Sequence, residues 1–313
     1  MSAIALDRLR PSPVRPGSRV AVISPSSPIE PDELDRGASQ LRAMGFEPVV
    51  DGSALARDAY VAGDAATRAE AFLRVWRDPS ITAVVASRGG YGSAQILPWL
   101  TRDLLRATPK LFVGYSDTTA LLSWLTTGCG LTAIHGPMID RRIAAGAAGV
   151  HLESFRAALE GGASGRSLAP PSLDVLREGA ASGLLVGGTV SLLCASLGTP
   201  FAFDPPDGSV LFLEEINERP FRLDRMLTQL RLAGILTRAS AIVFGEMPGC
   251  DDAGGLSARN VALRVLEDFR GPVLAGFPSG HTTGPVWSLP LGVRVHVRTD
   301  GDPALVVDEE AVE

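Results

Sequence analysis

The chain has 313 residues, of which 29 are basic and 35 acidic, and its formal net charge is −6. A surface that neutralises nucleic-acid phosphates needs an excess of basic side chains, so this balance argues against a nucleic-acid partner. Hydrophobic residues make up 45% of the chain, which is enough for a sizeable buried core and excludes a disordered protein. The length favours two domains.

The sequence also argues against a membrane or secreted protein. No apolar run approaches the roughly 20 residues that a membrane-spanning helix needs. Residues 1–17 contain Asp7, arginines and prolines where a signal peptide would need a continuous apolar stretch. We therefore expect a cytoplasmic protein with no membrane partner.

Cysteine and metal-ligand spacings exclude two further classes of protein. The three cysteines, Cys129, Cys194 and Cys250, are odd in number and form no C-x-x-C pair, so neither a disulfide framework nor a zinc site is indicated. We expect them to be reduced and buried. No H-E-x-x-H or comparable spacing points to a catalytic metal.

The first part of the chain alternates short apolar segments with amphipathic ones. Strands are predicted at 19–25, 46–50, 81–87 and 110–116, and helices at 30–45, 65–78 and 117–127. Such alternation favours a mostly parallel sheet with helices on both faces. We expect this α/β domain to occupy residues 1–140.

The pattern loosens after this domain. Residues 139–180 are rich in Gly, Ala and Pro, as is typical of connecting segments, with one helical stretch around 151–159. We therefore expect a linker over 141–178 that contains a short helix. A second, mixed α/β domain is expected over 179–313.

The second domain is predicted to mix strands and helices. Its predicted strands are 208–215, 239–246, 293–298 and 304–308, the last two antiparallel, and its predicted helices are 220–233 and 257–268. The helix at 220–233 should pack against the core, because four apolar residues recur on one face, namely Leu223, Met226, Leu227 and Leu230.

Ser116 lies where a predicted strand ends and a predicted helix begins. At such a turn a serine can be presented to substrate while the next backbone N–H points into the same space. Gly114 would leave room for the substrate, but Thr118 replaces the last glycine of the G-x-S-x-G pattern. A surface or capping serine is the commoner interpretation of so short a match.

A nucleophilic serine needs a base, and the chain has four histidines. His296 is expected to face solvent or a neighbouring strand, and His151 to cap a helix or lie on the surface. His135 could reach a cleft or be a core histidine. His281 lies in a loop rich in Gly, Pro, Ser and Thr, which is typical of loops that line sites, so it is our preferred base.

Two further segments could contribute to a site. Glu214 and Glu215 end a predicted strand, where adjacent side chains point to opposite faces, although a solvated acidic turn is an equal alternative. The glycine turn SRGGYGS at 87–93 could direct backbone N–H groups at an anion or an oxyanion. It lacks the glycine patterns of nucleotide-binding loops.

Taken in order, several segments resemble the LD-carboxypeptidases, or muramoyltetrapeptide carboxypeptidases, a family that includes the microcin C self-immunity peptidases. The matching segments are ISPSSP, SRGGYGS, GYSDTTALL, LVGGTVSLLCASLGTP, LFLEEINERPFRLDRMLTQL and FPSGHTTGPVWSLPLG. They extend from Arg19 to Val297. The resemblance implies an α/β fold with an N-terminal flavodoxin-like parallel-sheet domain, a smaller mixed α+β C-terminal domain, and the active site between them.

The resemblance also implies a catalytic triad. Ser116 would be the nucleophile, His281 the base and Glu214 the acid; we prefer Glu214 to Glu215 because the family's acid is the first of the pair. The oxyanion would be met by the backbone N–H groups of Asp117 and Gly90. No cofactor and no metal are implied.

Substrate contacts are less well defined by the sequence. The candidates for contact with the substrate are Arg88, Tyr91 and Thr189. The candidates for binding its free carboxylate are Arg88, Arg141 and Arg142. Thr189 stands where the family usually has Asn in a G-G-N motif, which weakens the substrate assignment more than the catalytic one.

The expected partner is a small peptide, murein tetrapeptide, whose terminal D-alanine would be released by hydrolysis of an L,D-peptide bond during cell-wall recycling. A homodimer is expected from the family. One alternative is an immunity-type peptidase acting on a peptidyl or aminoacyl nucleotide, for which Trp287 is a candidate stacking platform. The other is a binding module without turnover.

Overall fold

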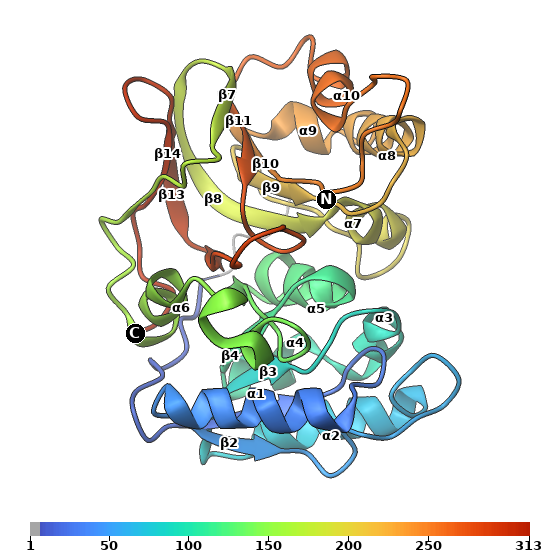
Figure 1. The fold of residues 1–313 in the computed structure, drawn as a ribbon, viewed down its shortest axis with the longest axis vertical. Coiled ribbons are helices and arrows are strands. Elements are labelled where there is room, and N and C mark those ends of the chain that lie inside the picture. The colour runs from blue at the N-terminus through green and yellow to red at the C-terminus, as the bar shows by residue number, and fades with distance from the viewer. Residues whose placement is uncertain (1–6) are drawn as a thin grey trace.

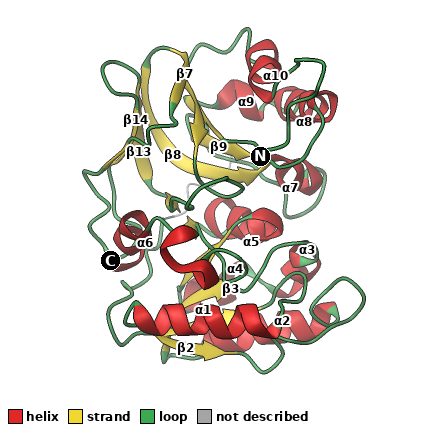
Figure 2. Ribbon diagram, viewed as in Figure 1, coloured by secondary structure: helices red, strands yellow, loops and turns green. Residues whose placement is uncertain are grey.

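The computed structural model describes residues 7–313. Residues 1–6, which belong to the segment 1–17 discussed above, lie outside the described range. Two β-sheets lie one above the other, the first in the lower half and the second in the upper half of Figure 1. Helices pack around both sheets (Figure 2).

The first sheet is a flavodoxin-like parallel sheet, as predicted. Its strand order is β12-β5-β4-β3-β1-β2, and the first five strands in the chain are all parallel. The order 2-1-3-4-5 is that of the flavodoxin-like doubly wound fold, in which ligands bind beyond the carboxyl ends of strands where the winding reverses. The strands are β1 Arg19–Ile23, β2 Glu47–Val50, β3 Ile81–Ala86, β4 Leu111–Gly114, β5 Ala133–His135 and β12 Leu289–Leu291.

The α-helices of this half confirm the predictions at 30–45 and 65–78. They are α1 Pro31–Ala43, α2 Ala65–Arg77, α3 Ser93–Ile96, α4 Arg102–Ala107 and α5 Thr119–Ser123. Helix α2 shows why: Asp64 caps it by accepting from the Thr67 backbone N–H at 2.7 Å, and Phe72 and Trp76 on its inner face are fully buried.

The second sheet is mixed, with strand order β6-β14-β13-β8-β9-β10-β11-β7. Strands β8 to β11 are parallel, and the flanking strands are antiparallel, including the predicted pair β13 and β14. The strands are β6 Ser167–Leu168, β7 Asp174–Arg177, β8 Ala180–Thr189, β9 Val210–Glu214, β10 Ala241–Gly245, β11 Val273–Phe277, β13 Arg294–Arg298 and β14 Ala304–Val307.

Helices cover one face of this second sheet. They are α7 Val190–Ser196, α8 Pro220–Leu232, α9 Ile235–Arg238 and α10 Ala258–Val265, and Figure 2 shows α8, α9 and α10 grouped together. On α8, the predicted apolar face is buried at Leu223, Leu227 and Leu230, and Met226 is partly buried.

Three boundaries differ from the sequence prediction. The segment predicted as a linker contains α6 Leu152–Glu160 but also supplies β6 and β7 to the second sheet. Strand β12 leaves the predicted second domain and pairs with β5 in the first sheet, so that an otherwise open edge gains hydrogen bonds. The helix predicted at 117–127 is divided into a 3-10 turn, α5 and a π turn at Trp124–Gly128.

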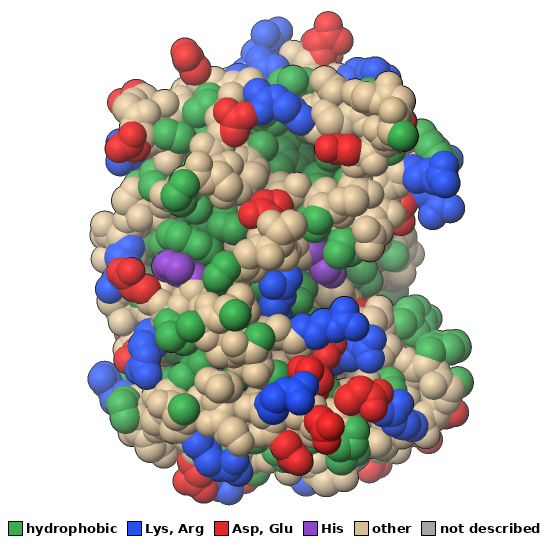
Figure 3. Space-filling view, in the orientation of Figure 1, with side chains coloured by type: hydrophobic (Ala, Val, Ile, Leu, Met, Phe, Trp, Pro, Cys, Tyr) green, Lys and Arg blue, Asp and Glu red, His purple; other side chains and the backbone are tan. Residues whose placement is uncertain are grey.

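The interior and the surface match the composition. All three cysteines are free and buried, as predicted, and burial raises the pKa of Cys129 and of Cys194 to about 12. Across residues 7–313, no helix combines the length and the apolar character needed to cross a membrane. On the face shown in Figure 3, acidic and basic side chains are interspersed, and histidines are visible where the two halves meet.

Candidate active site

Ser116 lies in a tight turn between β4 and α5. Its φ of +62° is in the left-handed region, which a non-glycine residue rarely adopts and which often marks a functional turn. The turn is held by the Thr118 hydroxyl, which donates to the Tyr115 carbonyl at 2.9 Å. Gly114 makes room for the Thr118 hydroxyl instead of for a substrate, which corrects the expectation from the sequence.

The glycine turn after β3 packs directly against Ser116. A Cβ atom on Gly89 would lie 2.9 Å from both Cβ and Oγ of Ser116, so any side chain there would displace the serine. In the described part of the chain, no hydrogen-bond acceptor meets the backbone N–H of Gly90 or of Asp117. Neither of these N–H groups, which the sequence analysis named as oxyanion donors, is therefore engaged elsewhere in the described residues.

The side chain of Asp117 has a structural task that the sequence analysis missed. Its carboxylate accepts from the Ser26 hydroxyl at 2.6 Å and from the Ser93 backbone N–H at 2.8 Å. The Ser93 hydroxyl donates to the Asp117 carbonyl at 2.6 Å. These bonds tie the Ser116 turn to the segments that follow β1 and β3, at the carboxyl edge of the first sheet.

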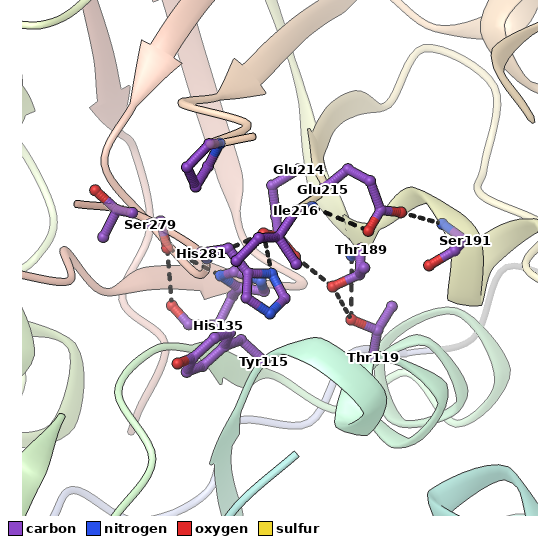
Figure 4. Close-up of polar contacts among 12 residues, drawn as sticks. Tyr115, Thr119, His135, Thr189, Ser191, Glu214, Glu215, Ile216, Ser279 and His281 are labelled. Atoms are coloured by element: carbon purple, nitrogen blue, oxygen red, sulfur yellow. Dashed lines mark hydrogen bonds and ion pairs between the residues drawn. The ribbon is translucent and has the colours of Figure 1, made fainter. Parts of the chain in front are cut away.

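His281 and a buried Glu214 form a pair in the second half of the molecule. The Nδ1 atom of His281 lies 2.7 Å from Oε2 of Glu214, and the His281 backbone N–H donates to the same oxygen at 3.0 Å. Glu214 ends β9 and is fully buried. The imidazole ring packs edge-on against Tyr115, with ring centroids 5.2 Å apart (Figure 4).

The two partners shift each other's pKa. Burial by itself lowers the pKa of His281, but the charge and the hydrogen bond of Glu214 outweigh it and leave that pKa above its ordinary value. Burial likewise raises the pKa of Glu214, and His281 outweighs it, so the net shift is downward. The pair therefore favours a carboxylate beside an imidazole that protonates readily.

Glu215 points the other way. Its carboxylate accepts from the Ser191 N–H at 2.8 Å, in the first turn of α7, and from its neighbour Ile216 at 3.1 Å (Figure 4). Glu214 and Glu215 are both almost inaccessible to solvent, so the solvated acidic turn is wrong. The alternation along the strand directs only Glu214 to His281.

Tyr115 connects the Ser116 turn to the His281 ring. Among residues 7–313, no hydrogen bond joins Ser116 Oγ to the imidazole. Tyr115 precedes Ser116 in the chain and its ring contacts the His281 ring, so the imidazole lies close to the turn that bears Ser116. Catalytic hydrogen bonds are often long in ligand-free enzymes and shorten when substrate binds.

The other histidines lie outside this pair. His151 caps α6 as predicted, accepting from the Ser154 N–H at 3.3 Å. His296 contacts the hydroxyl of Ser182 on the neighbouring strand at 2.9 Å, one of its two predicted positions.

His135 is a core histidine, which is one of the two alternatives that the sequence left open. It is fully buried, and Nδ1 lies 2.9 Å from the Ser279 hydroxyl, two residues before His281. Burial lowers its pKa to about 4, so it is neutral at physiological pH.

Arg142 also contributes to the site, in a way that its loop position in the sequence did not reveal. Its guanidinium donates to the carbonyls of Thr282 at 2.7 Å and Gly284 at 3.0 Å, and Nε lies 3.5 Å from the Tyr115 hydroxyl. These contacts attach Arg142 to the loop that carries His281.

The predicted substrate contacts lie in different settings. The side chain of Arg88 is 38% exposed and pairs with Asp140 at 3.4 Å, next to the glycine turn. Tyr91 is exposed beside Tyr60, at a centroid distance of 5.5 Å. Thr189, by contrast, is buried, and its hydroxyl donates to Glu214. The prediction that Thr189 contacts the substrate therefore does not fit its position in this structure.

One face of the Trp287 ring is already covered by another side chain. Its ring lies parallel to that of His151 at a centroid distance of 3.8 Å, and the ring of Phe277 packs edge-on against it. In residues 7–313, no group of three or more His, Cys, Asp or Glu side chains is arranged to hold a metal ion.

Comparison with known proteins identifies the family. The description "LD-carboxypeptidase N-terminal domain" matches residues 20–136, and "LD-carboxypeptidase C-terminal domain" matches residues 182–297. A murein tetrapeptide carboxypeptidase of Pseudomonas aeruginosa is 35% identical over 285 residues, covering 84% of this chain and 88% of that protein. The Escherichia coli microcin C7 self-immunity protein MccF is 27% identical over 329 residues, covering 95% of each chain.

The fold agrees with the sequence comparison. The solved structure of MccF in complex with glutamyl sulfamoyl guanosine superposes with a TM-score of 0.89 at 26% identity and covers 97% of this chain and 100% of that one. The family matches, the related sequences and the two-sheet fold all point to a carboxypeptidase. The chain therefore belongs to the LD-carboxypeptidase family of peptidases.

Proposed function

We propose that this protein is a serine carboxypeptidase that hydrolyses an L,D-peptide bond and releases the terminal D-alanine of murein tetrapeptide. One observation carries the proposal: a buried carboxylate, Glu214, bonds to Nδ1 of His281 beside the strained turn that bears Ser116. An acid, an imidazole and a serine in this order are the parts of a catalytic triad. The site needs no cofactor.

The chemical steps follow from this order. Because Nδ1 of His281 faces Glu214, the proton is assigned to Nδ1, and Nε2 is left to take the proton of the Ser116 hydroxyl. The Ser116 oxygen attacks the peptide carbonyl, and the oxyanion accepts from the N–H groups of Asp117 and Gly90. His281 then protonates the leaving amine, and water releases the acyl group from Ser116.

A carboxypeptidase must also bind the free carboxylate of its substrate. Arg88 is our candidate, because its side chain is 38% exposed and it directly precedes Gly89, which packs against Ser116. Tyr91, exposed on the same turn, would pack against the peptide. The name of the Pseudomonas aeruginosa relative supports murein tetrapeptide as the substrate.

That substrate is consistent with a cytoplasmic enzyme. We also propose that the protein is a homodimer, which sedimentation velocity would test.

Mass spectrometry of reaction products tests the function. The protein is incubated with muramyl tetrapeptide and, separately, with an aminoacyl adenylate analogue, since the relative MccF is a microcin self-immunity protein. We expect loss of D-alanine from the tetrapeptide, and a fall of at least about 1,000-fold in rate for Ser116→Ala. Hydrolysis of the adenylate alone would indicate the immunity-type peptidase. No hydrolysis of either compound would indicate a binding module.

A further inference from the structure

Glu214 receives hydrogen bonds on both carboxylate oxygens. Oε2 accepts from the backbone and the ring of His281, and Oε1 accepts from the hydroxyl of Thr189. Thr189 is the last residue of β8, which runs parallel to β9 and aligns Thr189 directly with Glu214. A buried carboxylate is stabilised when each oxygen has a donor. Thr189 supplies the donor to Oε1, which His281 does not contact.

Thr189 is itself held by Thr119, which belongs to the other half of the molecule. The Thr119 hydroxyl lies 3.3 Å from the Thr189 hydroxyl and accepts from the Thr189 backbone N–H at 3.1 Å (Figure 4). An ionised carboxylate can only accept, so the Thr189 hydroxyl donates to Glu214 and accepts from Thr119. Every proton in this chain of bonds has an acceptor.

The backbone makes this contact possible. Thr119 begins α5, three residues after Ser116, and α5 packs against the end of β8. A Cβ on Gly188 would lie 2.7 Å from the Thr119 hydroxyl oxygen, so the glycine before Thr189 lets the helix come this close. The chain of bonds therefore links the helix after Ser116 to Glu214 across the junction of the two sheets.

We propose that Thr119 and Thr189 are positioning residues, which hold the Glu214 carboxylate in the orientation that His281 needs and fix it relative to the Ser116 turn. This inference rests on the proposed function. Thr189 is 2% exposed and Thr119 is fully buried, so neither is expected to touch substrate. Their loss should therefore lower kcat and leave KM unchanged.

The test uses substitutions that keep the side-chain shape. We expect Thr189→Val to lower kcat about 10- to 100-fold, the effect of losing one hydrogen bond to a charged group. Thr189→Ser, which keeps the hydroxyl, should retain kcat within about threefold. Thr126→Val is the matched control, because Thr126 is also buried but its hydroxyl donates to the Leu122 carbonyl, one turn earlier in the chain, and not to Glu214.

A mutant cycle separates positioning from simple destabilisation. If the two threonines act through Glu214, Thr119→Val should lower kcat in the wild type but add little to Thr189→Val, and Thr189→Val should add little to Glu214→Gln. The His281 Nδ1 proton gives a readout without substrate: its low-field NMR signal should broaden or disappear in Thr189→Val and persist in Thr189→Ser.

Failure of the positioning role can be distinguished from failure of the proposed function. An unchanged kcat and an unchanged His281 signal in folded Thr189→Val would overturn the inference, as would equal loss in Thr189→Ser, or additive losses in the cycle. If instead the wild type releases no D-alanine, or Ser116→Ala is as active as the wild type, the proposed function itself fails. The NMR signal would still report whether Thr189 orders the pair.

Discussion

At the scale of single residues, the contact between Gly89 and Ser116 leaves no room for one added methyl group. The two residues come from different loops, after β3 and β4, and a Cβ added at Gly89 would lie 2.9 Å from the side chain of Ser116. Substitution at this contact should therefore affect catalysis more than folding.

We expect Gly89→Ala to lower kcat at least about 100-fold, because the new methyl group would displace the Ser116 hydroxyl by a fraction of an ångström or more. Gly52→Ala is the control, since nothing lies within 4 Å of a Cβ at Gly52. Steady-state kinetics and circular dichroism on both variants test this. Full activity in Gly89→Ala would show that the serine does not have to stay where the structure places it.

The pH dependence follows from the pair of His281 and Glu214. The base must be neutral to accept a proton, and its pKa lies above the ordinary 6.5, so kcat/KM should rise with pH through a midpoint above 6.5. In Glu214→Gln the raising charge is lost and burial dominates, so the midpoint should move to lower pH while the maximal rate falls. A midpoint that stays in place in Glu214→Gln contradicts this assignment.

Arg88 should matter only when the substrate has a free terminal carboxylate. We expect Arg88→Gln to raise KM about tenfold or more for the free peptide, the effect of losing one charge-assisted hydrogen bond. A peptide with an amidated terminus should be cleaved equally slowly by wild type and variant. If Arg88→Gln and wild type discriminate the two peptides to the same degree, another residue binds the carboxylate.

At the scale of elements, the loop that carries His281 is held from the first half of the molecule. Arg142 binds the carbonyls of Thr282 and Gly284 on one side of His281, and His135 binds the Ser279 hydroxyl on the other. Loops fixed by several such bonds keep a catalytic group in place without an element of regular structure.

Removing one of these attachments should loosen the loop. Arg142→Ala is expected to lower kcat about tenfold or more, because it leaves two carbonyls beside His281 without donors. Arg36→Ala is the matched control, since that side chain is 56% exposed on α1 and pairs with Glu33. Equal activity of the two variants would mean that the loop keeps its conformation without Arg142. Hydrogen exchange of the loop amides would show the loosening directly.

At the scale of the whole molecule, the two sheets share one apolar interior. A continuous cluster of buried side chains extends from β1 and β4 through Phe212 on β9 to Phe277 on β11, and a second cluster lies beneath α8. A shared core couples the stability of the two halves, so neither is expected to unfold by itself.

We therefore expect one cooperative thermal transition, with equal calorimetric and van't Hoff enthalpies. Leu227→Ala, in the cluster beneath α8, should destabilise the protein by about 2–5 kcal/mol and move that single transition to lower temperature. The surface variant Leu232→Ala, at a position 80% exposed, should leave it nearly unchanged. Two separated transitions in either protein would mean that the halves unfold independently.

The sequence by itself determined the local elements and the residue types of the site. Alternating apolar and amphipathic segments predict the parallel sheet because side-chain periodicity is a local property, and Asp64 or the apolar face of α8 can be recognised within a few residues. The motifs around Ser116, Glu214 and His281 carried the family resemblance.

Only the tertiary structure decided which of these groups meet. It pairs Glu214 and not Glu215 with His281, buries Thr189 behind the carboxylate, and assigns Arg142 to the His281 loop. It also moves β12 into the first sheet. These contacts join positions far apart in the chain, and their energies depend on burial and direction, which exist only after the two sheets have packed together.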